Sequence, residues 1–159
     1  MSDQYNFDIR LIFATLNGKV SAAIYHILDK AFKENSLDLT PEQWTILLYL
    51  WDKEGIRQQD LCDATFKDKP SMTRLLDTME RQNLVVRINY EVDRRTNLIY
   101  LTRRGKDIEA TVREVVNNTL KDSLQGVSAE ELEICQSVLK QIFKNATNPE
   151  SVSLCPSNE

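Results

Sequence analysis

The spacing of apolar residues changes partway between positions 67 and 106, and the change predicts a helix followed by a β-hairpin. One group recurs at i, i+3, i+4 and i+7, the spacing of one helical face: Met72, Leu75, Leu76 and Met79. A helix over about residues 69–82 is expected. A period of two begins at Leu84, and a second β-rich run, residues 97–101, follows a polar turn containing Asp93-Arg94-Arg95. This pattern predicts a two-stranded hairpin over about residues 84–101.

Helical spacing predicts three more helices before this stretch. Apolar residues recur every three to four positions over about residues 6–33, including Phe13, Leu16, Val20, Ile24, Ile27 and Ala31. A capping box of Thr40 and Gln43, with proline between them, opens a second helix over about residues 41–51. We expect that helix to bury Trp44, Leu47, Leu48 and Trp51. A short third helix is expected over about residues 57–64.

The turn after the third helix, Thr65-Phe66-Lys67, contains no glycine, although glycine is common where such a turn needs a positive φ. We expect Phe66 to fill the core at this point. Proline at position 70 fits the first turn of the next helix, whose cap is Asp68 or Lys69. Asn83 fits the end of that helix, because asparagine tolerates the left-handed conformation.

Two amphipathic helices are expected after the hairpin. Thr102 caps the first, over about residues 103–124, and Gly126 breaks it. A second capping box, Ser128 with Glu131, opens the other. Its apolar stripe contains Leu132, Cys135, Val138, Leu139, Ile142 and Phe143. The residues beyond 146 are polar and have no period, so we expect a disordered tail.

Charge is unevenly distributed along the chain. Residues 56–106 carry 11 Lys and Arg against 7 Asp and Glu, whereas the whole chain has 20 against 24. Basic character is therefore concentrated in the helix and hairpin. There, a helix N-terminus suits the major groove of DNA, and a basic hairpin tip suits a phosphate backbone or the minor groove.

Individual side chains in this segment have both a DNA-binding and an ordinary interpretation. Arg74 is expected to contact a base edge or a phosphate, and its alternative is an ion pair with Asp77. Ser71 and Thr73 are suited to close contact with DNA beside Pro70, or to ordinary helix-terminus hydrogen bonds. The lysines at positions 67 and 69 are better suited to phosphates than to bases.

Composition limits the other classes of function. The three cysteines, Cys62, Cys135 and Cys155, have no CxxC spacing, so we expect neither a disulfide framework nor a metal site. Cys62 and Cys135 are expected to be buried thiols. His26 is the single histidine, and no nucleophile–base pair or cofactor motif accompanies it, so we expect no enzyme and no cofactor. No run of about 18 apolar residues or signal pattern occurs, which favours the cytoplasm over a membrane.

The motifs in this region resemble the MarR family of winged helix-turn-helix regulators. The resemblance rests on LCDATFKDKPSMTRLL (residues 61–76), NLVVR (83–87), DRR (93–95) and LTRRG (101–105). In order and spacing it covers about residues 39–120. Any one of these motifs is weak evidence, whereas together they are specific.

This resemblance implies a mainly helical α+β fold, a winged helix-turn-helix with N- and C-terminal dimerisation helices. The expected domains are a dimerisation helix (1–38), a DNA-binding domain (39–104), C-terminal dimerisation helices (105–146) and the tail (147–159). The implied partner is a pseudo-palindromic double-stranded operator, bound by a homodimer. A monomer whose apolar stripes pack on one another is the alternative.

The resemblance also implies residue roles in the wing and in regulation. Arg94 or Arg95 would enter the minor groove while Asp93 braces the wing. A small phenolic or lipophilic effector would release the DNA from a repressor. Four residues are candidates for an effector pocket, although such residues are more often core or ordinary surface: Tyr25, His26, Trp44 and Tyr49. The rival function is a winged-helix module that contacts proteins and does not read DNA.

Overall fold

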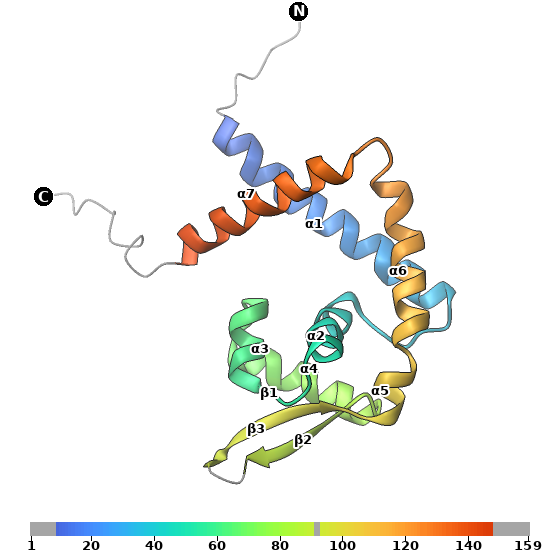
Figure 1. Ribbon diagram of the computed structural model, residues 1–159, viewed down its shortest axis with the longest axis vertical. Helices are drawn as coiled ribbons and strands as arrows, with labels where there is room; N and C mark the ends of the chain where they lie inside the picture. Colours follow the sequence, from blue (N-terminus) through green and yellow to red (C-terminus); the bar gives the residue numbers. More distant parts are fainter. Residues whose placement is uncertain (1–8, 91–92, 148–159) are drawn as a thin grey trace, which may run out of the picture. The chain divides into compact units, whose positions relative to one another are not determined.

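The computed structural model describes residues 9–90 and 93–147, and within them the side chains of residues 13–89 and 97–147. The chain forms two compact units, residues 1–120 and 121–159. The described residues form seven helices: α1 (Ile9–Glu34), α2 (Pro41–Asp52), α3 (Gln58–Thr65), α4 (Lys69–Arg81), α5 (Arg103–Asp107), α6 (Glu109–Ser123) and α7 (Ala129–Thr147). The three strands are β1 (Ile56–Arg57), β2 (Val85–Tyr90) and β3 (Asp93–Leu101) (Figure 1). The fold is the expected winged helix-turn-helix.

The strands form one antiparallel sheet in the order β1-β3-β2. Val85 pairs with Leu101 and Ile88 with Leu98, which is the expected hairpin. The two-residue strand β1 adds a third strand that the sequence did not indicate, with Ile56 opposite Ile99. A segment this short has too few residues to show a period of two.

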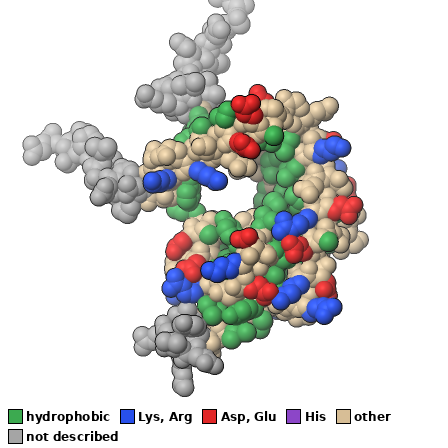
Figure 2. Space-filling model, viewed as in Figure 1, with side chains coloured by type: hydrophobic (Ala, Val, Ile, Leu, Met, Phe, Trp, Pro, Cys, Tyr) green, Lys and Arg blue, Asp and Glu red, His purple; other side chains and the backbone are tan. Residues whose placement is uncertain are grey.

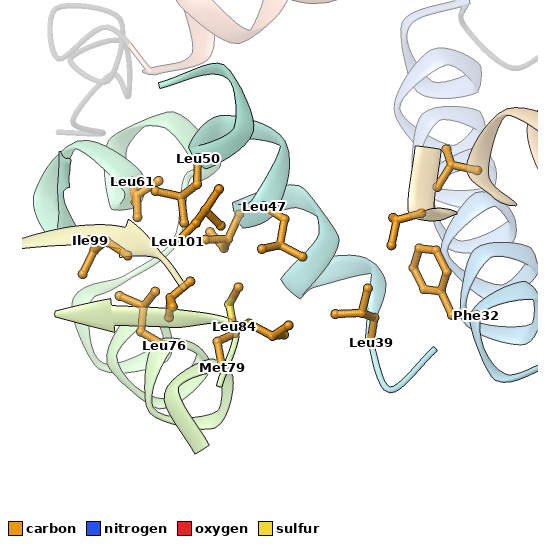
Figure 3. Packing of buried hydrophobic residues seen from close by; sticks show 14 of the residues in the cluster. Phe32, Leu39, Leu47, Leu50, Leu61, Leu76, Met79, Leu84, Ile99 and Leu101 are labelled. Carbon is orange, nitrogen blue, oxygen red and sulfur yellow. The ribbon is translucent and has the colours of Figure 1, made fainter. Parts of the chain in front are cut away.

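Within residues 39–104, the core lies between α2, α3, α4 and the inner face of the sheet (Figure 3). Figure 3 shows the buried side chains that meet there: Leu47, Leu50, Leu61, Leu76, Met79, Leu84, Ile99 and Leu101. The helical face expected for α4 is confirmed, because Met72, Leu76 and Met79 are fully buried. In α2 the expected burial is only partly correct. Ile46 and Leu50 are buried with Leu47, whereas Trp44, Leu48 and Trp51 are half-buried.

Helix ends follow the expected capping rules. Thr40 and Gln43 form the capping box of α2, and Ser128 and Glu131 form the reciprocal pair before α7. Thr102 caps α5 by accepting a hydrogen bond from the Gly105 N–H. The single helix expected after it is instead two helices, α5 and α6, separated at Ile108. The helix α5 contains no apolar residue, so periodicity alone could not locate the break.

The expected burial of Phe66 is wrong. Its side chain is 73% exposed, and its backbone is left-handed with φ 53°. Phe66 therefore occupies the position that glycine fills in many helix-turn-helix turns, and it adopts the turn conformation despite the steric cost of a Cβ there. Asn83 is left-handed as expected, with φ 57°.

Two apolar stripes that the sequence identified are largely uncovered. No residue of α7 is buried, and the stripe residues Val138, Leu139, Ile142 and Phe143 are exposed. In α1, Phe13, Leu16 and Val20 are exposed, whereas Leu28, Ala31 and Phe32 are buried. The expectation that Cys135 is buried is wrong, because it lies exposed on α7. Cys62 is buried as expected, and burial raises the pKa of its thiol.

Replacing Gly18 with alanine is expected to raise the free energy of unfolding by up to about 1 kcal/mol. Gly18 lies inside α1, and a Cβ built there meets nothing within 4 Å. Alanine would therefore improve helix propensity without a clash. Urea unfolding of wild type and variant measures the difference. Lower stability would contradict the expectation and show that this surface packs closely against another molecule.

Candidate nucleic-acid interface

The N-terminal end of α4 is fixed by Asp68, which settles the choice between Asp68 and Lys69 as cap. One carboxylate oxygen accepts the Ser71 N–H at 2.8 Å, and the other accepts the Ser71 hydroxyl at 2.8 Å. These two hydrogen bonds hold the pKa of Asp68 below its usual value. Pro70 occupies the first turn, where a missing N–H is harmless. The Ser71 hydroxyl is thus engaged at the helix end.

Replacing Asp68 with alanine is expected to destabilise the protein at neutral pH more than in acid. The folded-state pKa is depressed, so the carboxylate contributes stability above the unfolded-state pKa, about 4. That contribution is lost as the pH falls through the folded-state pKa. Thermal unfolding of wild type and variant should therefore differ at pH 7 and converge towards pH 3. A difference that is constant with pH would contradict the role of the charged cap.

Thr73 faces the neighbouring helix α3 rather than standing clear of the protein. Its hydroxyl oxygen accepts a hydrogen bond from Gln58 Nε2 at 2.9 Å and donates to the Lys69 carbonyl at 2.9 Å. The hydrogen bond from Gln58 ties α4 to α3, whereas the one to Lys69 lies within α4. A contact between Thr73 and DNA stays a prediction, and it would have to share a hydroxyl that is already in use.

Arg74, Lys69 and Pro70 are the exposed residues on the first turns of α4. The alternative partner for Arg74, the Asp77 carboxylate, is instead bound by Arg87 at 2.7 Å. Among the described side chains, the ion pairs that form include neither Arg74 nor Lys69. Their positive charges are therefore available to an anionic partner. On the face seen in Figure 2, basic and acidic side chains are interspersed.

Lys67 lies in a different environment from the other basic residues of this segment. Its ammonium group is 2.8 Å from Glu42 Oε1, and its side chain is only 24% exposed. This ion pair links the turn before α4 to the first turn of α2. A phosphate contact by Lys67 would require the pair to open.

The candidate wing residues, Asp93, Arg94 and Arg95, are the first three residues of strand β3. The expected polar turn therefore does not contain Asp93-Arg94-Arg95, because all three residues belong to the strand. In the register, Asp93 lies opposite Tyr90. The side chains of these residues lie outside the described part of the chain, so their roles stay predictions.

The sequence reasoning missed Arg87, a positioning residue behind the interface. Its guanidinium lies between Asp77 and Glu80 of α4, and its Nη2 donates to the Thr73 carbonyl at 3.1 Å. Position gave one signal, since Arg87 follows the buried Val85 by two residues and so shares the inner face of β2. An inward cation on a strand requires a partner.

A pocket of about 290 Å³ lies within the first unit, beside the turn that precedes α4. Its lining comes from α1, α2, the end of α3 and this turn: Ser21, Ile24, Tyr25, Leu28, Pro41, Glu42, Trp44, Thr45, Thr65 and Lys67. Of the four candidate pocket residues, Tyr25 and Trp44 line it. His26 is exposed outside the lining, and the Tyr49 hydroxyl donates to the Ala64 carbonyl at 3.1 Å.

Trp44, one of the lining residues, carries an unpaired polar group. Its indole Nε1 is buried and has no hydrogen-bond partner among the described residues. An unsatisfied buried donor costs free energy, which a ligand acceptor would recover where the pocket opens onto it. Elsewhere in the described residues, no three potential metal-binding side chains gather, and no helix is long and apolar enough to cross a bilayer.

Comparison with known proteins gives one consistent result. A family model described as the MarR family matches residues 37–96. The uncharacterised HTH-type transcriptional regulator YybA of Bacillus subtilis strain 168 is 25% identical over 80% of this chain and 84% of its own length. The transcriptional regulator HosA of Escherichia coli O127:H6 is 26% identical over 75% of this chain and 93% of its own.

Solved structures agree with the sequence comparisons. The crystal structure of transcriptional regulator PA3341 has a TM-score of 0.71 and 30% identity, and covers 84% of this chain and 97% of its own. A mutant MarR from E. coli, complexed with operator DNA, has a TM-score of 0.75 at 22% identity, and covers 89% of this chain and 99% of its own. The second likeness concerns the fold.

Proposed function

The chain belongs to the MarR family of transcriptional regulators, and from this premise we propose that it represses transcription as an operator-bound homodimer that a small effector releases. The observation that carries the proposal is the outer side of α4, where Arg74 and Lys69 are exposed without ion pairs among the described side chains. A helix that presents free cations beside a β-hairpin suits a DNA groove.

The proposed contacts divide into base reading and backbone positioning. Arg74 reads a base edge in the major groove, because its planar guanidinium can bind guanine through two hydrogen bonds. Lys69 contacts phosphate, and Pro70 and Ser71 bring the backbone of α4 close to the DNA strand. Arg94 or Arg95 enters the minor groove from the wing, and Asp93 braces it. Lys67 is the least favoured of these contacts, since Glu42 already neutralises it.

The proposed homodimer forms through residues 1–38 and 105–146, leaving residues 39–104 to read DNA and residues 147–159 as a tail. The uncovered stripes support it, because an apolar helix face that stays exposed in one chain is suited to burial against a second. Selection from random duplexes should return an inverted repeat whose half-sites are about 10 base pairs apart. Recovery of single, unrepeated sites would contradict the dimer.

The proposed effector site is the pocket beside α4. A ligand there would touch Trp44 of α2, together with Thr65, the last residue of α3, and Lys67 of the turn that leads into α4, the proposed recognition helix. Binding could therefore change how α4 is held. Release requires the ligand to prefer the conformation that binds DNA poorly, by a free energy equal to the loss of DNA affinity.

Replacing Trp44 with phenylalanine is expected to raise the concentration of effector needed for release by about fivefold. The substitution removes the unpaired indole N–H but keeps an aromatic ring, and a neutral hydrogen bond contributes about 1 kcal/mol. The probes are benzoate and its hydroxylated analogues, titrated against the protein–operator complex. Tyr49→Phe is the matched control, because Tyr49 does not line the pocket. Equal responses of wild type and Trp44→Phe to an active probe would contradict this site.

The rival function, a winged-helix module that contacts only proteins, is not favoured by the comparisons, and the family consists of regulators rather than enzymes. We place the protein in the cytoplasm, where a regulator of this kind meets the chromosome. No observation on the described residues favours a second function.

A further inference from the structure

Arg87, on strand β2, makes several polar contacts with α4, the proposed recognition helix. It lies on β2 opposite Ile99, which is fully buried, and its own side chain is 17% exposed. Its Nη1 is 2.7 Å from Asp77 Oδ1 and also contacts Glu80 Oε2. Its Nη2 donates to the Thr73 carbonyl at 3.1 Å, and its backbone N–H donates to Glu80 Oε1 at 3.0 Å. One arginine thus binds three residues of α4.

These three residues lie along one side of α4, next to the proposed base-reading side chain. Positions 73, 77 and 80 are spaced by four and three residues, so they share one helical face. Asp77 also follows Arg74 by three residues, close enough for the two side chains to pair on a helix. The Asp77 side chain remains 47% exposed, so it could turn towards Arg74 if nothing held it.

We propose that Arg87 is a positioning residue for DNA reading, which holds Asp77 and Glu80 and thereby keeps the Asp77 carboxylate away from Arg74. Two consequences follow. Arg74 stays free for the base edge, and the single positive charge of Arg87 offsets one of the two carboxylate charges of α4 where phosphates would approach. The Thr73 carbonyl contact also fixes the rotation of α4 relative to the wing. The inference rests on the proposed DNA reading and adds a residue that does not itself touch DNA.

Replacing Arg87 with glutamine is expected to weaken specific binding at least about tenfold, the scale of one lost base contact. Freed Asp77 would then pair with Arg74 and repel phosphate. The double variant Arg87→Gln, Asp77→Asn removes the competing carboxylate and should recover most of the loss. Arg87→Lys keeps a cation near Asp77 but cannot also reach the Thr73 carbonyl as the forked guanidinium does, so its affinity should lie between those of wild type and Arg87→Gln. A purely structural role for Arg87 gives no such recovery.

The measurement is fluorescence anisotropy on a selected operator and on a scrambled duplex, with thermal unfolding of every variant. Suppose that the wild type prefers the operator. Unchanged binding by Arg87→Gln, or no recovery in the double variant, would then overturn this inference but not the proposed function. Wild-type protein without any preference would overturn the proposed function and the inference with it. If Arg87→Gln does not fold, the single variant Asp77→Asn tests the proposal. Its affinity for the operator should stay within about threefold of wild type. Binding tenfold tighter than wild type would overturn the proposal, because Asp77 would then already compete for Arg74 in the wild type.

Discussion

Charge reversal at Arg74, Arg74→Glu, is expected to abolish specific operator binding while the protein remains folded. The side chain is exposed on α4, and its neighbour Asp77 is bound to Arg87, so folding does not depend on its charge. A bidentate base contact contributes about 1–3 kcal/mol to discrimination, and the new carboxylate adds repulsion from phosphate. Together these effects should weaken specific binding by at least about 100-fold. Anisotropy titration measures the affinity, and circular dichroism measures the fold.

The matched control for this variant is Lys53→Glu. Lys53 is the exposed C-cap residue of α2 and belongs neither to the segments proposed for the dimer nor to the proposed DNA contacts, so the same change of charge occurs away from both. Its affinity should stay within about threefold of wild type, because an exposed charge away from the bound DNA contributes little. Specific binding retained by Arg74→Glu would remove Arg74 from the interface. Equal losses in both variants would point to net charge rather than to base reading.

Gly105→Ala is expected to lower the free energy of unfolding by about 2–4 kcal/mol, the largest effect on stability among these variants. A Cβ at this position would lie 2.2 Å from the Leu84 carbonyl oxygen, which belongs to the backbone and cannot rotate away. The same oxygen accepts the Thr102 N–H at 3.0 Å, and the Gly105 carbonyl accepts the Trp51 indole N–H at 2.9 Å. Relieving the clash would disturb the junction of hairpin, α5 and α2.

Urea unfolding of Gly105→Ala compared with Gly18→Ala measures this cost. The two variants make the same chemical change, but only one of them meets backbone, so their effects on stability should have opposite signs. Gly105→Ala should lower the melting temperature by roughly 5–15 °C. Equal stabilities of the two variants would contradict the close approach at Leu84. The glycine of the LTRRG motif is thus explained by backbone packing rather than by DNA contact.

Local sequence rules identified most elements of the fold. The apolar face of α4, the existence of strand β2 and the Thr40, Thr102 and Ser128 caps depend on residues within a few positions of one another. These relations can be recognised without knowing the fold. The break at Ile108 could not be located in this way, because α5 contains no apolar residue whose spacing could be compared with that of α6. The buried face of β2 did not follow from its alternation, because Val86 and Ile88 are exposed whereas Val85 is buried.

Burial was less predictable where it depends on what covers an amphipathic stripe. Cys135 and Val138 belong to a regular stripe on α7, yet both are exposed. Periodicity shows that a face is apolar but not which molecule covers it. Phe66 was misassigned for a related reason. A large apolar side chain suggests the core, whereas the backbone of this turn points it outwards.

In the candidate site, the sequence identified residue types correctly but could not assign partners. Lys67 was expected to contact phosphate, yet the fold brings it to Glu42, 25 residues earlier. Arg87 was overlooked because its contacts with Asp77 and Glu80 depend on how the hairpin lies against α4. Long-range ion pairs follow from tertiary packing, which local patterns do not encode.

The most direct test of DNA reading is equilibrium binding of the purified protein to the DNA upstream of its own coding region, against a scrambled duplex, across a salt series. Dimeric protein should prefer the upstream duplex, and the logarithm of its affinity should fall steeply with the logarithm of salt concentration, because binding releases counterions from phosphate. If that duplex is not preferred, selection from random DNA supplies the best alternative operator. Equal, weak binding to the scrambled and the selected duplexes would contradict sequence-specific reading.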